Sequence, residues 1–258
     1  MEAKDRTGGS MNADDEPLSS DAARSMGRRE FLALGALGIG TLAVGGLAGC
    51  AVPAQDSGQA PSTEGSGTAL LAGAKAGDIV HLGTVSFTYY GGADSAFSED
   101  IGWRVLAVED GRVQVVSEDI IDLRPYNDRN EDVTWEGCDL REWLNGGFYD
   151  GLPEGMKEGA LTIQVANAAN PSYGTPGGNG TSDKVFLLSI GEAGQYFSND
   201  DDRQAMCNGA GWWWWLRSPG VARCAAFVGY DGSVNDGGGN VSNAKLGVRP
   251  ALWLSLGS

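Results

Sequence analysis

The chain has 258 residues, with 18 basic and 34 acidic side chains and a formal net charge of −16 at pH 7. A surface this acidic repels nucleic-acid phosphates and anionic lipid head groups, which argues against nucleic-acid partners and favours a soluble, secreted surface. His81 is the only histidine and the four cysteines form no CxxC pair, so the sequence indicates no metal site. A structural role for His81 is favoured over a catalytic one.

Residues 1–50 have the features of an export signal. Arg28 and Arg29 form a twin-arginine pair before an apolar run, residues 31–47. A membrane-spanning helix needs about 20 apolar residues, and this run is shorter and interrupted by glycines. It ends in LAGC, a lipobox pattern in which Cys50 receives a diacylglycerol. We therefore expect a twin-arginine lipoprotein signal peptide, with a buried or amphipathic helix as the alternative.

Residues 51–76 are rich in Ser, Gly, Pro and Ala and contain few large apolar side chains. Such a segment cannot bury enough surface to offset its ordering entropy, which predicts a disordered tether. The folded domain is then expected over residues 77–258, about 180 residues, which suits one compact unit. Five basic and seven acidic residues lie in the first 49, which leaves 13 and 27 in the exported part and a net charge of −14.

The first half of the domain predicts strands and two helices. Short β-branched and aromatic runs at 78–83 and 84–90 precede a hairpin, residues 103–117, which turns at Asp110-Gly111. A helix follows at residues 138–145, and Gly146-Gly147 should end it. Pro153 is expected to start a second, short helix, and residues 166–183 form a long polar loop.

The second half is predicted to be mostly strand and loop. A buried strand at 185–188 precedes a helix whose Ser189 and Glu192 are spaced as a capping box. Strands are expected at 212–216, on both sides of a turn at 231–232, and at 247–256, where Pro250 favours an edge or a bulge. Together these elements predict an α+β fold with at least one mixed or antiparallel sheet.

Four of the eight tryptophans are consecutive, Trp212 to Trp215. On a strand these side chains alternate between the two faces, and each buried indole covers roughly 200 Å² and needs a partner for its N–H. A core strand packed on both sides is the favoured interpretation. The alternative, an exposed platform for stacking sugars, would leave a large apolar patch on a secreted protein.

The sequence resembles a bacterial C-type-lectin-like family that includes the variable target proteins of diversity-generating retroelements. The resemblance rests on WWLRSPG, a Gly-, Asn- and Ser-rich stretch, and then GVRPALWL, supported by TWEGCDLREWLNGGFY and DKVFLLSIGEA upstream. It covers residues 77–256. It implies a C-type-lectin-like fold, with mixed or antiparallel sheets, helices in the N-terminal half and a loop-rich C-terminal ligand-binding region, the variable region being about 212–256.

In that family a reverse transcriptase introduces errors at template adenines, so asparagine codons become codons that end in a pyrimidine. Residues 221–246 contain no Glu, Gln, Met or Trp, which those codons cannot encode, and Lys245 is the one departure. Loops of Gly, Asn and Ser adapt to a ligand while a few larger side chains supply contact energy. Phe227, Tyr230 and Arg223 are the expected anchors. The predicted ligand-binding residues are Val221, Ala222, Arg223, Cys224, Phe227, Gly229, Tyr230, Ser233, Asn235, Asp236, Asn240, Ser242, Asn243, Ala244 and Leu246.

Within the same stretch, small apolar side chains are expected to remain inside: Ala225, Ala226, Val228, Val234 and Val241. The Glu/Gln-Pro-Asn/Asp and Trp-Asn-Asp motifs of calcium-dependent lectins do not occur, so neither a metal nor another cofactor is expected. Formylglycine-generating enzymes share the broad fold but need a reactive cysteine pair. Cys224 falls in the variable stretch, where a catalytic residue would not be kept, so an enzymatic function of this kind is disfavoured.

Two functional hypotheses remain open from the sequence. The first is a lipid-anchored binding protein without enzymatic activity, displayed on the outer face of the cytoplasmic membrane and diversified toward an unknown extracellular protein or glycan. The second is a non-diversified lectin-like or structural module that binds a constant glycan or envelope component. In either case the domain is expected to be monomeric and to contact the membrane only through its lipid.

Overall fold

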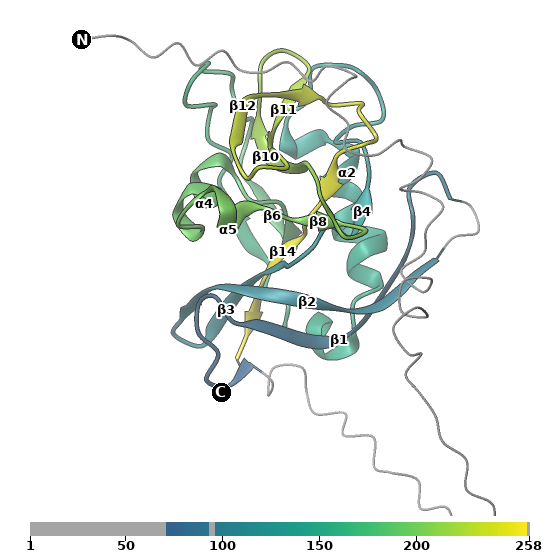
Figure 1. Ribbon diagram of the computed structural model, residues 1–258, viewed down its shortest axis with the longest axis vertical. Coiled ribbons are helices and arrows are strands. Elements are labelled where there is room, and N and C mark those ends of the chain that lie inside the picture. Colours follow the sequence, from purple (N-terminus) through teal and green to yellow (C-terminus); the bar gives the residue numbers. More distant parts are fainter. Residues whose placement is uncertain (1–70, 93–95, 257–258) are drawn as a thin grey trace, which may run out of the picture.

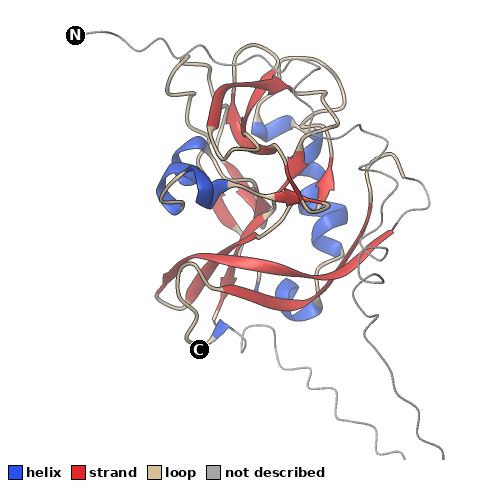
Figure 2. Cartoon of the chain, viewed as in Figure 1, coloured by secondary structure: helices blue, strands red, loops and turns tan. Residues whose placement is uncertain are grey.

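The computed structural model describes residues 71–92 and 96–256, which form an α+β domain with mostly antiparallel sheets, as predicted (Figures 1 and 2). The first sheet has five strands in the order β1-β2-β3-β14-β7. Its strands are β1 (Ile79–Thr88), β2 (Ala96–Glu109), β3 (Arg112–Ser117), β14 (Ala251–Ser255) and β7 (Val185–Phe186). The first and last strands of the domain therefore belong to one sheet.

The second five-stranded sheet has the order β12-β11-β10-β13-β4. Its strands are β12 (Val234–Asn240), β11 (Cys224–Val228), β10 (Trp214–Pro219), β13 (Gly247–Val248) and β4 (Asp122–Leu123). All of its pairings are antiparallel except that of β10 with β13. Two small sheets pair β5 (Ile163–Val165) with β6 (Thr181–Asp183) and β8 (Met206–Cys207) with β9 (Ala210–Gly211).

Short helices flank the strands (Figure 2). They are η3 (Trp135–Gly137), α2 (Asp139–Trp143), η4 (Leu144–Phe148), α3 (Glu154–Gly159), α4 (Ile190–Tyr196) and α5 (Asp200–Arg203). The predicted capping box at the start of α4 is confirmed, because Ser189 and Glu192 each accept the other's backbone N–H.

The prediction that Gly146-Gly147 ends the first helix is wrong. The chain continues from α2 into the π-helical turn η4, which contains both glycines. Leu144 and Phe148, at the two ends of that turn, are completely buried. Their burial outweighs the low helix propensity of the two glycines between them.

Both predicted hairpin turns are confirmed. Gly111 and Gly232 adopt φ values of 75° and 82°, in the left-handed region that glycine tolerates best. The second turn pairs Val228 with Val234 across β11 and β12. A Cβ on Gly232 would lie 1.7 Å from the carbonyl oxygen of Asp200, so the turn also depends on a close approach to α5.

The predicted C-terminal strand at 247–256 is two short strands in two different sheets. β13 joins the second sheet and β14 lies between β3 and β7 in the first. Pro250 stands between them, where its missing N–H interrupts the ladder while its carbonyl accepts a bond from Ser117 N. Arg249 beside it is buried, with its guanidinium 4.7 Å from the Trp214 ring centroid, and burial lowers its pKa to about 10.

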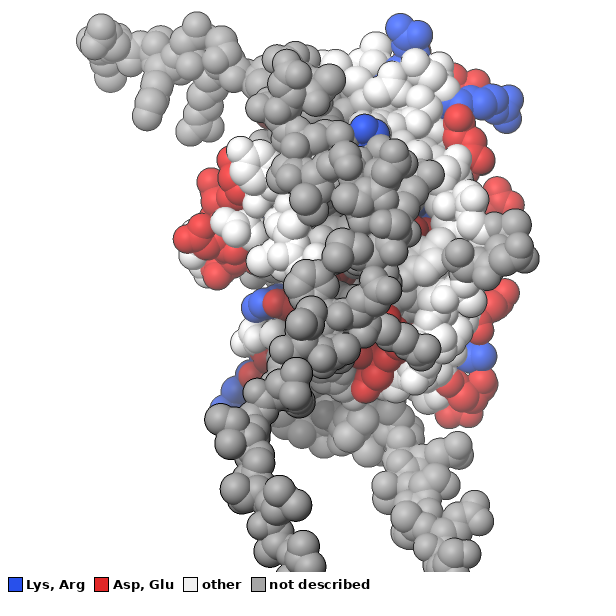
Figure 3. Space-filling model, turned by 45° about the vertical axis from the view of Figure 1, so that its right-hand side comes forward, with Lys and Arg blue, Asp and Glu red and all other residues white. Residues whose placement is uncertain are grey.

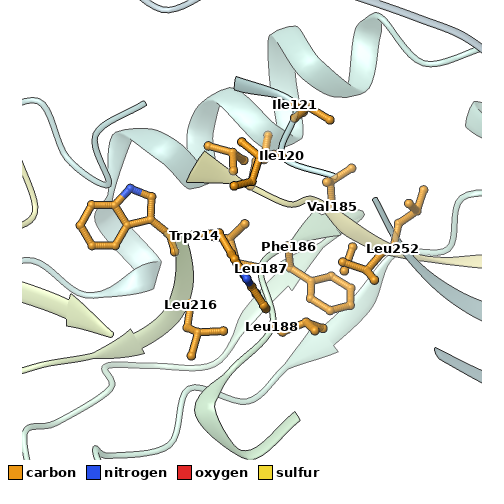
Figure 4. Close-up of a cluster of buried hydrophobic side chains, with 14 of the residues drawn as sticks. Ile120, Ile121, Val185, Phe186, Leu187, Leu188, Trp214, Leu216 and Leu252 are labelled. Carbon is orange, nitrogen blue, oxygen red and sulfur yellow. The ribbon is translucent and has the colours of Figure 1, made fainter. Parts of the chain in front are cut away.

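The tryptophan run forms part of the core, as predicted, although β10 begins only at Trp214. Three indoles of the run donate to backbone carbonyls: Trp212 to Lys245 at 2.7 Å, Trp214 to Arg203 at 3.0 Å and Trp215 to Arg124 at 2.9 Å. These bonds satisfy the buried N–H groups without any other side chain. Figure 4 shows Trp214 and Leu216 on one side of residues 185–188, with Leu252 of β14 on the other.

The N-terminal boundary lies earlier than the predicted residue 77. Leu71 is buried in the core, and Gly77 N donates to Val105 O at 2.8 Å. The predicted signal peptide, with Arg28, Arg29 and Cys50, and residues 51–70 of the predicted tether lie outside the described residues. Within the described part of the chain, none of the helices has the length and hydrophobicity needed to cross a bilayer.

Candidate binding surface

The predicted ligand-binding residues lie on the hairpin β11–β12 and on the segments that flank it, at the upper end of the view in Figure 1. β12 is the edge strand of its sheet. The structure does not gather these residues on one surface, because the hairpin separates them. Tyr230 and Ser233 stand at its turn, whereas Val221 to Cys224 and Asn240 to Ala244 stand at its open end.

At the turn, Tyr230 is 51% exposed, and its ring makes an edge contact with Trp213 at 5.5 Å between centroids. Arg203 of α5 donates from Nε to Gly232 O at 2.9 Å. The predicted anchor Tyr230 is thus accessible and rests on the rigid core.

At the open end, Val221 is 40% exposed, and Ala222 and Arg223 are also exposed. Arg223 has a φ of 57°, and its backbone N–H donates to Asp132 Oδ1 at 2.9 Å. Its carbonyl accepts from Val241 N at 3.0 Å. The backbone at this position is fixed while the side chain stays available.

Three predicted ligand-binding residues are buried, and those predictions are wrong. Phe227 is only 3% exposed and pairs with Trp215 on the neighbouring strand, so the expected aromatic anchor belongs to the core. Gly229 is buried beside the turn, and Leu246 is buried next to β13. Ala225, Ala226 and Val228 are buried as well, so both faces of β11 are covered and Phe227 cannot reach a ligand.

The small apolar residues of the stretch were expected inside. Ala225, Ala226, Val228 and Val241 are buried, as predicted, whereas Val234 is only half-buried. The polar residues Asn235, Asp236, Ser242 and Asn243 are also half-buried, as are Cys224 and Ala244.

A segment that the sequence analysis treated only as a loop joins this surface. Tyr173 is 55% exposed, and its hydroxyl lies 3.4 Å from the position that a Cβ on Gly237 would occupy. Val221 N donates to Gly237 O at 2.9 Å. Tyr173, Val221, Asn235, Asp236 and Gly237 therefore lie together, and we call them the Gly237 face.

Asn170 holds this segment against β12. It is 2% exposed, and its Nδ2 donates to Pro219 O at 2.7 Å and to Asp236 O at 2.8 Å. Its Oδ1 accepts the backbone N–H groups of Ser172 and Tyr173. One buried amide thus fixes Tyr173 relative to the hairpin.

Sequence reasoning missed Tyr173 although a signal was present. A tyrosine among Asn, Ser, Gly and Pro, as in NPSYGTPGG, has the composition that marked the hairpin as a binding surface. The two hydrogen bonds of Asn170 to Pro219 O and Asp236 O span 49 and 66 residues of sequence, and no local pattern encodes them.

Burial disfavours the thiolate form of two cysteines, Cys138 and Cys224. Cys138 and Cys224 are free, so Cys138, Cys207 and Cys224 do not pair with one another. Burial raises the pKa of Cys138 to about 12 and also raises that of Cys224, which disfavours the nucleophilic thiolate. Among residues 71–92 and 96–256, no three His, Cys, Asp or Glu side chains are placed to hold a metal ion.

Acidic side chains occur in several groups over the face seen in Figure 3, with fewer basic ones among them.

Comparison with known proteins finds no match among curated proteins and none among solved structures. Residues 110–256, more than half of the chain, match the family described as domain of unknown function DUF6273, and the chain belongs to that family.

Proposed function

We propose that the chain is a surface-displayed binding protein that captures an extracellular protein or glycan through the Gly237 face and the exposed ends of the β11–β12 hairpin. The observation that carries this proposal is the pair of exposed apolar side chains, Tyr173 and Val221, beside a glycine-rich edge strand. Aromatic side chains at fixed positions give contact area at low entropic cost, and the surrounding Asn, Asp and Ser offer adaptable hydrogen bonds. The proposal includes no catalytic residue and no cofactor.

The way this surface is held supports diversification of its side chains. Pro219 O and Asp236 O accept from Asn170, and Gly237 O accepts from Val221 N. In each contact the acceptor is a main-chain carbonyl of β10 or β12, and these carbonyls persist when the side chains of those strands change. Side chains at the surface can therefore vary while the backbone remains in place.

The same proposal assigns a C-type-lectin-like fold to the domain. The first and last strands of the domain share one sheet, and strands β10 to β13 of the predicted variable region belong to the other five-stranded sheet. Export through the twin-arginine pathway and acylation of Cys50 would place a monomeric domain on the outer face of the membrane. Cys50→Ser should abolish labelling with radioactive palmitate, and labelling that persists would refute the anchor.

The diversification test is a DNA comparison. A near-copy of the 3′ coding end, differing only where one copy has adenine, should lie near the gene together with a reverse transcriptase gene. If both are absent, diversification is refuted, and a constant glycan or envelope component becomes the ligand class.

The binding test uses the displayed protein and a panel of glycans and secreted proteins. We expect Tyr173→Ala to weaken binding of any retained ligand at least about tenfold, because a central aromatic contact is removed. The matched control is Val108→Ser on β2, an exposed apolar residue in the other sheet. Equal loss in both variants, or no loss in Tyr173→Ala, would contradict the placement of the site.

A further inference from the structure

A hollow of about 360 Å³ opens between the end of β1, the segment after β4 and helix α2. Its wall includes the ring of Tyr90 and the glycines of the π-helical turn, where no side chain closes the space. The lining residues are Tyr90, Arg124, Pro125, Asp128, Asp139, Leu140, Glu142, Trp143, Gly146 and Gly147. None of them belongs to residues 221–246.

A buried ion pair stands at the hollow. Arg124 Nη2 lies 3.1 Å from Asp122 Oδ2, and the Asp122 side chain is 4% exposed. Burial raises the pKa of Asp122 and lowers that of Arg124. Such a pair costs desolvation energy and seldom adds stability, so its presence in a hollow marks a candidate site.

Aromatic rings fix the guanidinium of Arg124. Its Cζ lies 3.8 Å from the ring centroid of Trp143 and 5.2 Å from that of Tyr90. Nε donates to Asp122 and Nη2 to Thr88 O, both at 3.3 Å. Nη1 makes no hydrogen bond within the described residues, so two N–H donors of a held guanidinium remain for a ligand.

Carboxylates form the other side of the hollow. Asp128 Oδ1 accepts from the Tyr90 hydroxyl at 3.1 Å, and Asp139 Oδ2 accepts from Asp128 N at 2.8 Å. The carboxylate of Glu142 is exposed and takes part in no ion pair or side-chain hydrogen bond with another described residue. Asp139 and Glu142 therefore offer acceptor oxygens to a cation.

We propose that this hollow binds a small zwitterion of the α-amino acid class, with the ligand carboxylate on Arg124 Nη1 and the ligand ammonium between Asp139 and Glu142. A lone anion would meet three carboxylates, and a lone cation would meet the guanidinium; a zwitterion satisfies both. The volume is at the lower end of small-molecule sites, which suits a ligand of this size. This site is separate from the proposed binding surface and does not depend on it.

The test is titration of the full chain, purified in detergent, with a panel of free amino acids, followed by saturation-transfer NMR and calorimetry. Acetate and methylamine serve as the single-charge probes. We expect saturable binding of at least one amino acid, and binding of either single-charge probe at least about tenfold weaker, since each lacks one charged hydrogen bond.

Glu142→Gln should weaken amino-acid binding about tenfold while the exposed, matched variant Glu158→Gln on α3 leaves it unchanged. Arg124→Lys keeps the charge but loses the planar fork, and should also weaken binding; circular dichroism confirms that it folds. The absence of binding to every amino acid, equal binding of acetate or methylamine, or an unaffected Glu142→Gln variant would each overturn the proposal. Tyr173→Ala should leave amino-acid binding unchanged, which distinguishes this site from the proposed binding surface.

Discussion

Strands β10 and β12 lie two positions apart in one sheet and are held in opposite ways. β10 is fixed by large side chains, including two buried indoles and the buried Arg217, whose guanidinium pairs with Glu192. β12 carries three glycines, and its own main chain bonds to β11, to the backbone N–H of Val221 and to the side-chain amide of Asn170. The comparison teaches that rigidity and tolerance of substitution can be separated within one sheet.

The largest expected effect comes from removing a side chain of the β10 region. Trp215→Ala should lower the free energy of unfolding by about 3–5 kcal/mol, because it leaves a cavity and orphans the carbonyl of Arg124. Asp236→Ala on β12 should change it by less than about 0.5 kcal/mol, since this half-buried carboxylate bonds only the hydroxyl of Ser172. Urea unfolding of both variants measures the difference, and similar losses would erase the contrast between the strands.

Asn170→Ala tests how the main chain of β12 is attached to the segment of residues 170–173. Two buried carbonyls and two backbone N–H groups would lose their partner, which should cost about 2–4 kcal/mol. Amide exchange of Ser172 and Tyr173 should accelerate at the same time. A loss below about 0.5 kcal/mol would show that contacts other than this side-chain amide hold the surface.

Gly232→Ala tests how closely the main chain of the β11–β12 turn is held, and it removes no contact. The added Cβ meets the backbone of Asp200 and the residue has a positive φ, so we expect a loss of about 2 kcal/mol or more. Gly194→Ala in α4 is the control, because its Cβ has open space and should stabilise the helix by about 0.5–1 kcal/mol. Thermal unfolding of the two variants should shift in opposite directions.

The last effect, which is absent at pH 7, is a pH dependence from Cys138, a thiol buried in the core. Its pKa of about 12 lies above the ordinary value of 9.0, so the folded state holds the proton more tightly than the unfolded state. The free energy of unfolding should therefore fall as pH rises from 9 toward 12, with no contribution at pH 7. Cys138→Ala should remove this part of the slope, whereas Cys224→Ala, at a half-buried thiol, should remove less.

Local chemistry explains what could be predicted. The turns at Gly111 and Gly232 and the capping box at Ser189 depend on residues a few positions apart, so their patterns are visible in the sequence. Burial of the tryptophan run could also be predicted, because so many indoles on one short segment require a core.

Long-range packing explains the errors. Phe227 is covered because its pairing partner is Trp215, and the glycines of η4 stay helical because Leu144 and Phe148 reach the core. Tyr173 joins the surface because Asn170, distant in sequence from β12, bonds to the Asp236 carbonyl. Arg124 resembles an ordinary surface charge until the fold brings Trp143 and Asp122 against it.

The position of β14 determines when the domain can finish folding. This strand is formed by residues 251–255 and lies between β3 and β7, so the first sheet stays divided until residues 251–255 have left the ribosome. A frameshift or premature stop before residue 251 deletes the strand that joins those halves. Translation must therefore stay in frame through the β11–β12 hairpin for the first sheet to be completed. A variant of the hairpin that shifts the reading frame would lack β14 and would not fold.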